Sequence, residues 1–399
     1  MKKGMVIAIL VIISLISLTN ALNGPKADFS WSPTHPSTAD VVHFYDESTP
    51  QTGIVERVWY FGDGNGSIEK NPTHQYVRPG NYTVKLVVVW NISGNLTADI
   101  AEKNITIANQ PPVANAGPDR IVATKTVEFN GSASYDPDGI IVSYHWDFGD
   151  GEEAIGKIVQ HTYDNDGLYI VTLNVTDDFG AHDEDTCQIV VDTSSPNTTV
   201  ELNGTLGENG WYISNVTVSF EVNETTTELN ATYYRIDGGN WTVYEEEFVI
   251  SDEGVHLLEF YSEDIAGNIE EIKNVTIKID KSKPSVNIIT PQEKRLYVFG
   301  RSILPTFRKT IVIGKIMVEA NATDNIGVAM VKFLVDNEEM ANFTAPPYQW
   351  KWGGMFGTKE LKVEAYDEAG LNDSKSMDVL IFSLFKPRNI EGKVVESSK

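Results

Sequence analysis

The chain has 399 residues, which is too many for one ordinary hydrophobic core, so its length predicts two to four domains. Hydrophobic residues make up 41% of it, a proportion typical of folded domains and too high for general disorder. The formal net charge is −25. Nucleic acids and anionic lipids bind basic patches, so we expect neither as a partner.

The first residues are arranged like an export signal. Lys2 and Lys3 precede an apolar run over 5–18, and Ala21 supplies a small residue after it. That order predicts a signal peptide over residues 1–21 and a secreted or cell-surface protein. The alternative is an uncleaved N-terminal segment, which would be the only membrane attachment that we expect. The run is short for a membrane span.

The chain has one cysteine, Cys187, so no intramolecular disulfide can form. Cys187, Ile189 and Val191 alternate on one side of an expected strand, which favours a buried thiol that packs as a small apolar group. The alternative is a free thiol that pairs with another molecule.

Seventeen Asn-X-Ser/Thr sequons occur between Asn65 and Asn372. This density is typical of an exported glycoprotein, although a chain rich in Asn and Thr also generates sequons passively. Side chains in a strand alternate between core and solvent. That alternation places four candidate acceptors on the solvent side of their expected strands: Asn104, Asn174, Asn215 and Asn274.

Short alternating runs separated by Gly, Asn, Asp and Pro turns follow to the end of the chain, which predicts an all-β fold. Proline-marked joints end at Pro112, Pro196 and Pro284. We therefore predict four immunoglobulin-like β-sandwich modules in series after the signal segment, joined by links too short for free tumbling. They are module one (25–108), module two (111–192), module three (196–280) and module four (284–383), followed by a polar tail (384–399).

Modules one and two are repeats that align without a gap from Ile54 onward, at an offset of 87 residues. The shared positions are aromatic, glycine or inward-facing apolar residues. At the central motif, Trp59, Phe61, Gly62, Asp63 and Gly64 correspond to Trp146, Phe148, Gly149, Asp150 and Gly151.

The stretches "GSASYDPDGIIVSYHWDFGDG" and "HTYDNDGLYIVTLNVTDDFG" of module two resemble the PKD domain. Module one departs from the pattern, with "ESTPQTG" in place of "DPDG" and Tyr60 in place of Asp147. The stretch "YYRIDGGNW" of module three corresponds to "VKFLVDNEE" of module four, and both modules end in a D-x-A-G turn. These features are similar to bacterial and archaeal immunoglobulin-like surface repeats. The whole layout resembles an archaeal PKD-domain-containing cell-surface protein. The resemblance implies modules that space other domains or contact protein or carbohydrate.

The acidic stretch "HWDFGDGEE" at 145–153 could form a catalytic pair, a metal cage or a turn. Paired carboxylates would have to be present in both copies, yet Tyr60 replaces Asp147 in module one. What both copies keep is an aromatic pair followed by Gly-Asp-Gly, so we expect two core side chains and a tight turn capped by aspartate.

No cofactor and no metal site is predicted. The segment that begins at Asp63 starts like a calcium loop, but Ile68 and His74 stand where an EF-hand needs glycine and glutamate. Adventitious calcium at this turn or at "DPDG" (136–139) is the alternative. His74 and His161 share strand parity with tyrosines, which favours packing over ligation.

Trp350 and Trp352 lie two residues apart, hence on one face of an expected strand. Exposed, they could stack on sugar rings; otherwise they pack in the core or at an edge. Trp211 with Tyr212, or Trp241, could stack on sugars in the same way.

No HExxH, G-x-S-x-G or Walker sequence occurs, and no nucleophile stands near a base, so we do not expect an enzyme. We predict an exported stalk, spacer or adhesive segment whose partners are surface proteins or polysaccharide. The alternative is a carbohydrate- or protein-binding accessory to an extracellular hydrolase.

Overall fold

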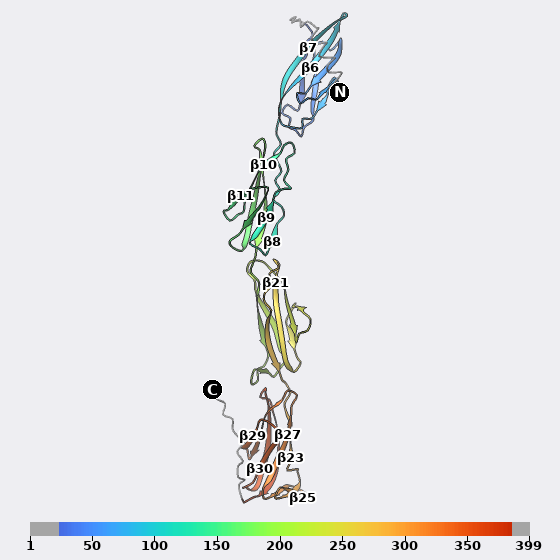
Figure 1. The fold of residues 1–399 in the computed structure, drawn as a ribbon. Coiled ribbons are helices and arrows are strands. Elements are labelled where there is room, and N and C mark those ends of the chain that lie inside the picture. The colour runs from blue at the N-terminus through green and yellow to red at the C-terminus, as the bar shows by residue number, and fades with distance from the viewer. Residues whose placement is uncertain (1–23, 385–399) are drawn as a thin grey trace. The chain divides into compact units, whose positions relative to one another are not determined.

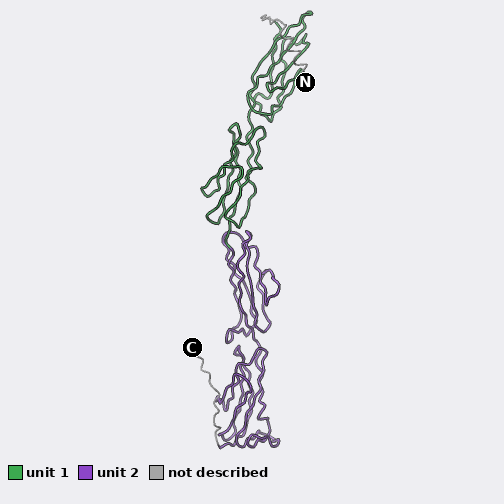
Figure 2. Tube along the Cα trace, in the orientation of Figure 1, with its two compact units in different colours: residues 1–194 green, residues 195–399 purple. Residues whose placement is uncertain are grey.

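The computed structural model describes residues 24–384, which form strands and turns without any helix. They divide into two compact units, residues 1–194 and 195–399 (Figure 2). The predicted signal peptide lies outside the described residues, as does all of the predicted tail except Leu384. A search of the described part of the chain finds no helix able to span a membrane.

Module one lies in the first unit and consists of two facing sheets. The first sheet has the order β1-β2-β5, with β1 (Phe29–Ser32), β2 (Val42–Asp46) and β5 (Thr73–His74). The second has the order β4-β3-β6-β7, with β4 (Gly66–Ser67), β3 (Ile54–Tyr60), β6 (Gly80–Ile92) and β7 (Asn95–Ile107). Alternate residues of both sheets face inward and form one core around Trp59.

Module two, which follows module one along the chain (Figure 1), also has two sheets, with two strands in the first and five in the second. A two-stranded sheet pairs β9 (Thr126–Asn130) with β12 (Ile158–Thr162). The five-stranded sheet has the order β11-β10-β13-β14-β8, with β11 (Glu153–Ile155), β10 (Ile141–Asp147), β13 (Gly167–Asp177), β14 (His182–Val191) and β8 (Arg120–Val122). Cys187 is 2% exposed in its core, together with Ile189 and Val191. This burial confirms the packing interpretation of the cysteine.

Module three opens the second unit. Its three-stranded sheet has the order β15-β17-β20, with β15 (Asn197–Asn203), β17 (Val216–Asn223) and β20 (Phe248–Ile250). Its five-stranded sheet has the order β16-β22-β21-β18-β19, with β16 (Trp211–Tyr212), β22 (Lys273–Ile279), β21 (Gly254–Asp264), β18 (Leu229–Ile236) and β19 (Thr242–Val243). The core between them contains Val216, Val218 and Phe220, as their alternation predicted.

Module four has a three-stranded sheet of order β23-β27-β30, with β23 (Ser285–Thr290), β27 (Ile316–Thr323) and β30 (Tyr348–Trp352). Its second sheet has the order β25-β24-β26-β32-β31-β28-β29. These strands are β25 (Arg301–Pro305), β24 (Arg295–Val298), β26 (Thr310–Ile313), β32 (Asn372–Phe382), β31 (Phe356–Asp367), β28 (Val328–Val335) and β29 (Glu338–Phe343). A separate core joins the two sheets.

The all-β fold with four sandwich cores is therefore confirmed. Two features of the sheets were not apparent from the sequence. Short strands at the sheet edges pair in parallel, as β8 does with β14 and β16 with β22. In module four, the hairpin of β24 and β25 adds an edge to the larger sheet, a feature that short alternating runs could not distinguish from core strands.

Candidate functional site

The motif shared by modules one and two forms the centre of each core. Trp146 is 0% exposed and its indole Nε1 donates to the carbonyl oxygen of Gly156 at 3.1 Å. Trp59 is equally buried and donates to the carbonyl of Glu69 at 3.0 Å. Phe148 packs within the same cluster. The apolar rings are thus buried and each indole N–H has a partner, which is what a structural tryptophan requires.

The aspartate of each motif braces its turn. One oxygen of Asp150 accepts the backbone N–H of Glu152 at 3.1 Å, and the other lies 2.7 Å from Nε2 of His161. Burial acts to raise the pKa of Asp150, but the hydrogen bonds from His161 and Glu152 outweigh it and hold this pKa below its usual value. Asp63 makes the same contacts with Asn65 and His74.

The histidine of each brace packs as expected. His161 stacks flat on Phe148 with ring centroids 4.0 Å apart, and its edge meets Tyr163. His74 stacks in the same way on Phe61 at 4.3 Å. An Asp–His pair could serve acid–base chemistry, but no serine, threonine or cysteine side chain of the described residues bonds to either imidazole.

The remaining acidic residues of 145–153 point to separate partners rather than to one centre. Asp147 accepts the N–H of Gly149 at 2.9 Å, while Glu153 lies 3.1 Å from Nε2 of His145. The latter pair is largely exposed, with side chains 41% and 61% accessible. Asp147, Asp150 and Glu153 therefore have separate partners and do not converge on one catalytic pair or one set of metal ligands.

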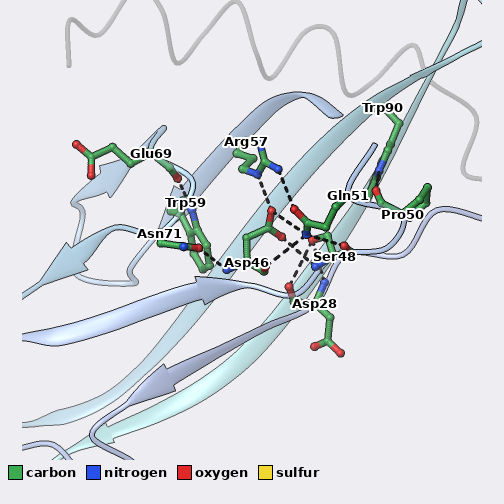
Figure 3. A network of polar contacts seen from close by, with 10 residues as sticks. All are labelled: Asp28, Asp46, Ser48, Pro50, Gln51, Arg57, Trp59, Glu69, Asn71 and Trp90. Atoms are coloured by element: carbon green, nitrogen blue, oxygen red, sulfur yellow. Dashed lines mark hydrogen bonds and ion pairs between the residues drawn. The ribbon is translucent and has the colours of Figure 1, made fainter. Parts of the chain in front are cut away.

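Module one contains a buried polar network that its sequence departure creates (Figure 3). The Asp46 side chain is fully buried and binds Nε of Arg57 at 2.6 Å. It also accepts the N–H of Ser48, and its own N–H donates to Asn71. Burial acts to raise the pKa of Asp46, yet the bonds from Ser48 and Arg57 lower it overall. This network anchors "ESTPQTG", where module two instead has "DPDG".

Polar side chains join module one to module two. Gln110 donates its backbone N–H to Asp138 at 3.1 Å and its side-chain amide to Thr38 at 2.6 Å. Thr38 in turn donates to Asp138, which is 8% exposed. Asn109 donates to Asp177 at 2.6 Å. The sequence suggested "DPDG" (136–139) only as a turn for adventitious calcium, and no local pattern indicated that Asp138 contacts the proline-marked joint.

The last turn of a module is built on one aspartate in modules two, three and four. Asp177 accepts the N–H of Ala181 at 2.9 Å, Asp264 that of Asn268 at 2.8 Å, and Asp367 that of Leu371 at 2.8 Å. The D-x-A-G similarity of modules three and four therefore reflects a common hydrogen-bonded turn, which module two shares.

The two tryptophans of β30 do not form an open platform. Trp352 is 0% exposed and belongs to the core of module four. Trp350 is half-buried, stacks on Trp352 at 6.0 Å and packs against Phe333. This is the core-packing alternative that the sequence left open, and it removes Trp352 from any surface on which a sugar could stack.

Larger exposed apolar groups lie elsewhere in module four. Phe307 is 100% exposed and Phe299 is 79% exposed, both beside the hairpin of β24 and β25. Phe299 also lines an open hollow of about 530 Å³ with Ile313 and Phe382. Aromatic groups in such positions can make contacts with another molecule.

The four candidate glycosylation sites are accessible to different degrees. Asn104 and Asn274 are exposed on β7 and β22, and Asn215 is exposed just before β17. Asn174 on β13 is only partly exposed and donates to Glu184 at 2.7 Å. Whether sugars are attached stays a prediction.

Comparison with known families identifies most of these modules. Residues 23–107 and 109–191 each match the PKD domain, and residues 284–363 match a bacterial Ig domain. The match to the PKD domain covers modules one and two, where the resemblance was drawn from the shared motif.

The similar proteins are much longer than this chain. Collagenase ColA of Clostridium perfringens is 28% identical over 196 residues, which cover 43% of this chain and 17% of that protein. Pre-pro-metalloprotease PrtV of Vibrio cholerae is 46% identical over 66 residues, covering 16% and 7%. The chain therefore spans less than a fifth of either. The crystal structure of the PKD1 domain of Vibrio anguillarum Epp is 37% identical, covers 22% of this chain and 100% of that one, and has a TM-score of 0.20.

Proposed function

Because the chain carries two PKD domains followed by a bacterial Ig-like domain, we propose that it is an exported, non-enzymatic spacer that holds contact surfaces away from the point where the protein is attached or released. In this proposal the folded modules themselves provide the spacing. Each module has its own core, so a force applied along the chain acts on four separately folded sandwiches.

The joint between modules one and two is the observation that supports this proposal best. A spacer has to resist bending, and hydrogen bonds across a short joint restrict its bending further. Here Thr38, Gln110 and Asp138 form a closed set of hydrogen bonds, and Asn109 adds a bond to the last turn of module two. Thr38 and Asp138 are both nearly inaccessible to solvent, so water competes little for these bonds.

A distance measurement across this joint tests the proposal. Spin labels placed on the full chain at Lys70 in module one and Glu128 in module two, both exposed, report the spread of distances between the modules. We expect a narrow distribution in the wild type. The double substitution Asn109→Ala and Asp138→Ala should broaden it, because it removes the bonds to Asp177, Gln110 and Thr38.

The matched control is Asp119→Ala. Asp119 also accepts a backbone N–H, from Gln188, but both residues lie within module two. The control should keep the narrow distribution. A wild-type distribution as broad as that of the double variant would mean that the joint is a hinge, and the spacer proposal would fail.

A second function, binding for an extracellular hydrolase, is supported by the exposed Phe299 and Phe307 and by relatives that are named as a collagenase and a metalloprotease. Its partner would be polysaccharide or protein. Sedimentation with insoluble collagen and with insoluble polysaccharides tests it. Binding that is lost in Phe307→Ser but kept in the control Trp350→Phe, at a half-buried position of β30, would favour this function. Absence of binding to every matrix would argue against it.

A further inference from the structure

Three aspartates meet where module three passes into module four. Asp280 directly follows β22, Asp324 directly follows β27, and Asp367 is the last residue of β31. A carboxylate oxygen from each lies within 4.8 Å of the other two. Asp280 is 0% exposed and Asp367 is 3% exposed. Each comes from a different strand end, so the cluster depends on the fold of both modules.

Each carboxylate is held through one oxygen only. Asp280 accepts the N–H of Ser282 at 3.2 Å, Asp324 accepts those of Ile326 and Gly327 at 2.8 and 2.9 Å, and Asp367 accepts that of Leu371. The other oxygen of each aspartate is buried and has no hydrogen-bond partner. Buried polar atoms normally have partners, so three unpartnered oxygens in one place indicate a missing ligand.

The ligand must carry positive charge. Three carboxylates this close repel one another, and burial removes the water that would screen them. None of the ion pairs formed by lysines and arginines of the second unit, within the described residues, includes any of the three. Burial, together with the charges of Asp324 and Asp367, raises the pKa of Asp280 to about 6, which reflects the same unfavourable field.

The joint between modules one and two offers an internal comparison. Asn109 lies two residues after the end of β7, Asp280 directly follows β22, and Asp177 occupies the place of Asp367 in the last turn. There the Asn109 amide donates to Asp177 at 2.6 Å, so both oxygens of this turn aspartate have partners. Asp280 has no proton to donate when ionised. A cation between Asp280 and Asp367 would fill the role that the amide fills in the first joint.

We propose that Asp280, Asp324 and Asp367 bind one calcium ion that ties the end of module three to two loops of module four. The donors are all oxygen, with no histidine or cysteine, which selects a hard cation. Calcium accepts several carboxylates at about 2.3–2.6 Å, so oxygens on opposite sides of it stand roughly 5 Å apart. Magnesium usually takes one or two carboxylates and keeps its water.

The joint is already closed by other bonds, so the ion would find its ligands in place. The backbone N–H of Glu208 donates to the carbonyl of Ala369 at 2.8 Å, and the Asn209 side chain donates to that of Glu368 at 3.0 Å. Asn325 donates to Glu253 across the same joint at 2.8 Å. Such preorganisation lowers the entropic cost of binding.

Calcium titration of the full chain after chelator treatment tests the proposal. Calorimetry should detect calcium binding in the wild type, and Asp280→Asn should bind one equivalent fewer. The matched control is Asp378→Asn, which removes an exposed carboxylate of β32 in the same module and should bind as many equivalents as the wild type. No binding by the wild type, or the same number of equivalents in Asp280→Asn, would overturn the site.

Thermal unfolding gives a second, independent readout. Without calcium, Asp280→Asn should have a higher Tm than the wild type, because it removes one of three repelling charges. With calcium, the wild-type Tm should rise with each tenfold increase in free ion, whereas the Tm of the corresponding unfolding transition in Asp280→Asn should not change. A variant that melts lower in chelator and still gains from calcium would show that Asp280 is only structural. An equal Tm rise with magnesium would refute the assignment to calcium.

Discussion

Nε2 of His161 lies 2.7 Å from Oδ2 of Asp150, and His74 lies at the same distance from Asp63 in the other copy of the repeat. In each copy the histidine ring lies flat on the motif phenylalanine. The aspartate therefore links the turn to the core through a stacked ring. This relationship explains why both copies keep Gly-Asp-Gly and a histidine eleven residues further on, without any need for catalysis.

Asp150→Asn should change stability only slightly, whereas Trp146→Ala should unfold module two. Asparagine can still accept the Glu152 N–H. Removing a fully buried tryptophan costs about 3–5 kcal/mol, a large part of the stability of one small domain. Urea unfolding followed by fluorescence measures both. Loss of a binding or catalytic activity in a folded Asp150→Asn protein would contradict the structural role.

Gly149→Ala should destabilise module two more than Gly151→Ala. Both glycines have positive φ, +78° and +95°, which costs a side-chain-bearing residue about 1–2 kcal/mol. A Cβ at Gly149 would in addition stand 2.5 Å from the carbonyl oxygen of Ile170, whereas one at Gly151 would meet nothing within 4 Å. The difference between the two urea midpoints isolates the steric part. Equal midpoints would mean that the turn shifts to accept the methyl group.

Asp46→Asn should destabilise module one at pH 7 but much less at an acid pH at which Asp46 is protonated in the folded chain. The pKa of Asp46 is lower in the folded chain than its usual value, so its contribution is present above the unfolded pKa and is lost as pH falls through the folded one. When Asp46 is protonated, the wild type also lacks the charged bond to Arg57 that the variant lacks at every pH, so the two proteins become similar in stability. Leaving buried partners unpaired costs about 1–3 kcal/mol at pH 7.

The control for this titration is Glu102→Gln, which breaks an ion pair with Lys85 whose side chains are about half exposed. Exposed pairs contribute roughly 0–1 kcal/mol, so this variant should resemble the wild type at both pH values. Free energies of unfolding from denaturant titration at the two pH values provide the comparison. A deficit of Asp46→Asn that is the same at both would rule out ionisation as its cause.

Cys187 should react slowly with a thiol reagent in the folded protein. It is 2% exposed in the core of module two, and burial raises the pKa of its thiol. Both effects lower the concentration of accessible thiolate. Absorbance with Ellman's reagent should rise slowly in buffer and at once in concentrated urea. Rapid reaction of the folded chain would mean that β14 opens readily.

Much of the fold could be predicted from the alternation of apolar and polar residues and from the turn residues that separate the strands. Alternation identified strands such as β17, and the offset between modules one and two identified the residues around Trp59 and Trp146 as core. These inferences succeed because side-chain alternation in a strand is a local property that a short segment displays by itself.

The contacts between modules could not be predicted in this way. Asp138 and Asp177 in the first joint, and Asp280 with Asp324 and Asp367 in the second unit, come together only once each sandwich has folded. Their sequence separations exceed what any local pattern reports. Trp352 illustrates the same limit: its parity with Trp350 was correct, but parity does not say which face of a strand a sheet covers.

Stretching single molecules of the full chain tests most directly whether the four modules fold independently and bear load in series. A module can extend by about 3.6 Å per residue, so after its folded length is subtracted the rupture of module one, two or three should lengthen the chain by roughly 260 Å, and that of the longer module four by roughly 320 Å. We predict four separate force peaks, three at the shorter spacing and one at the longer. One concerted rupture, or extension without peaks, would contradict the spacer account.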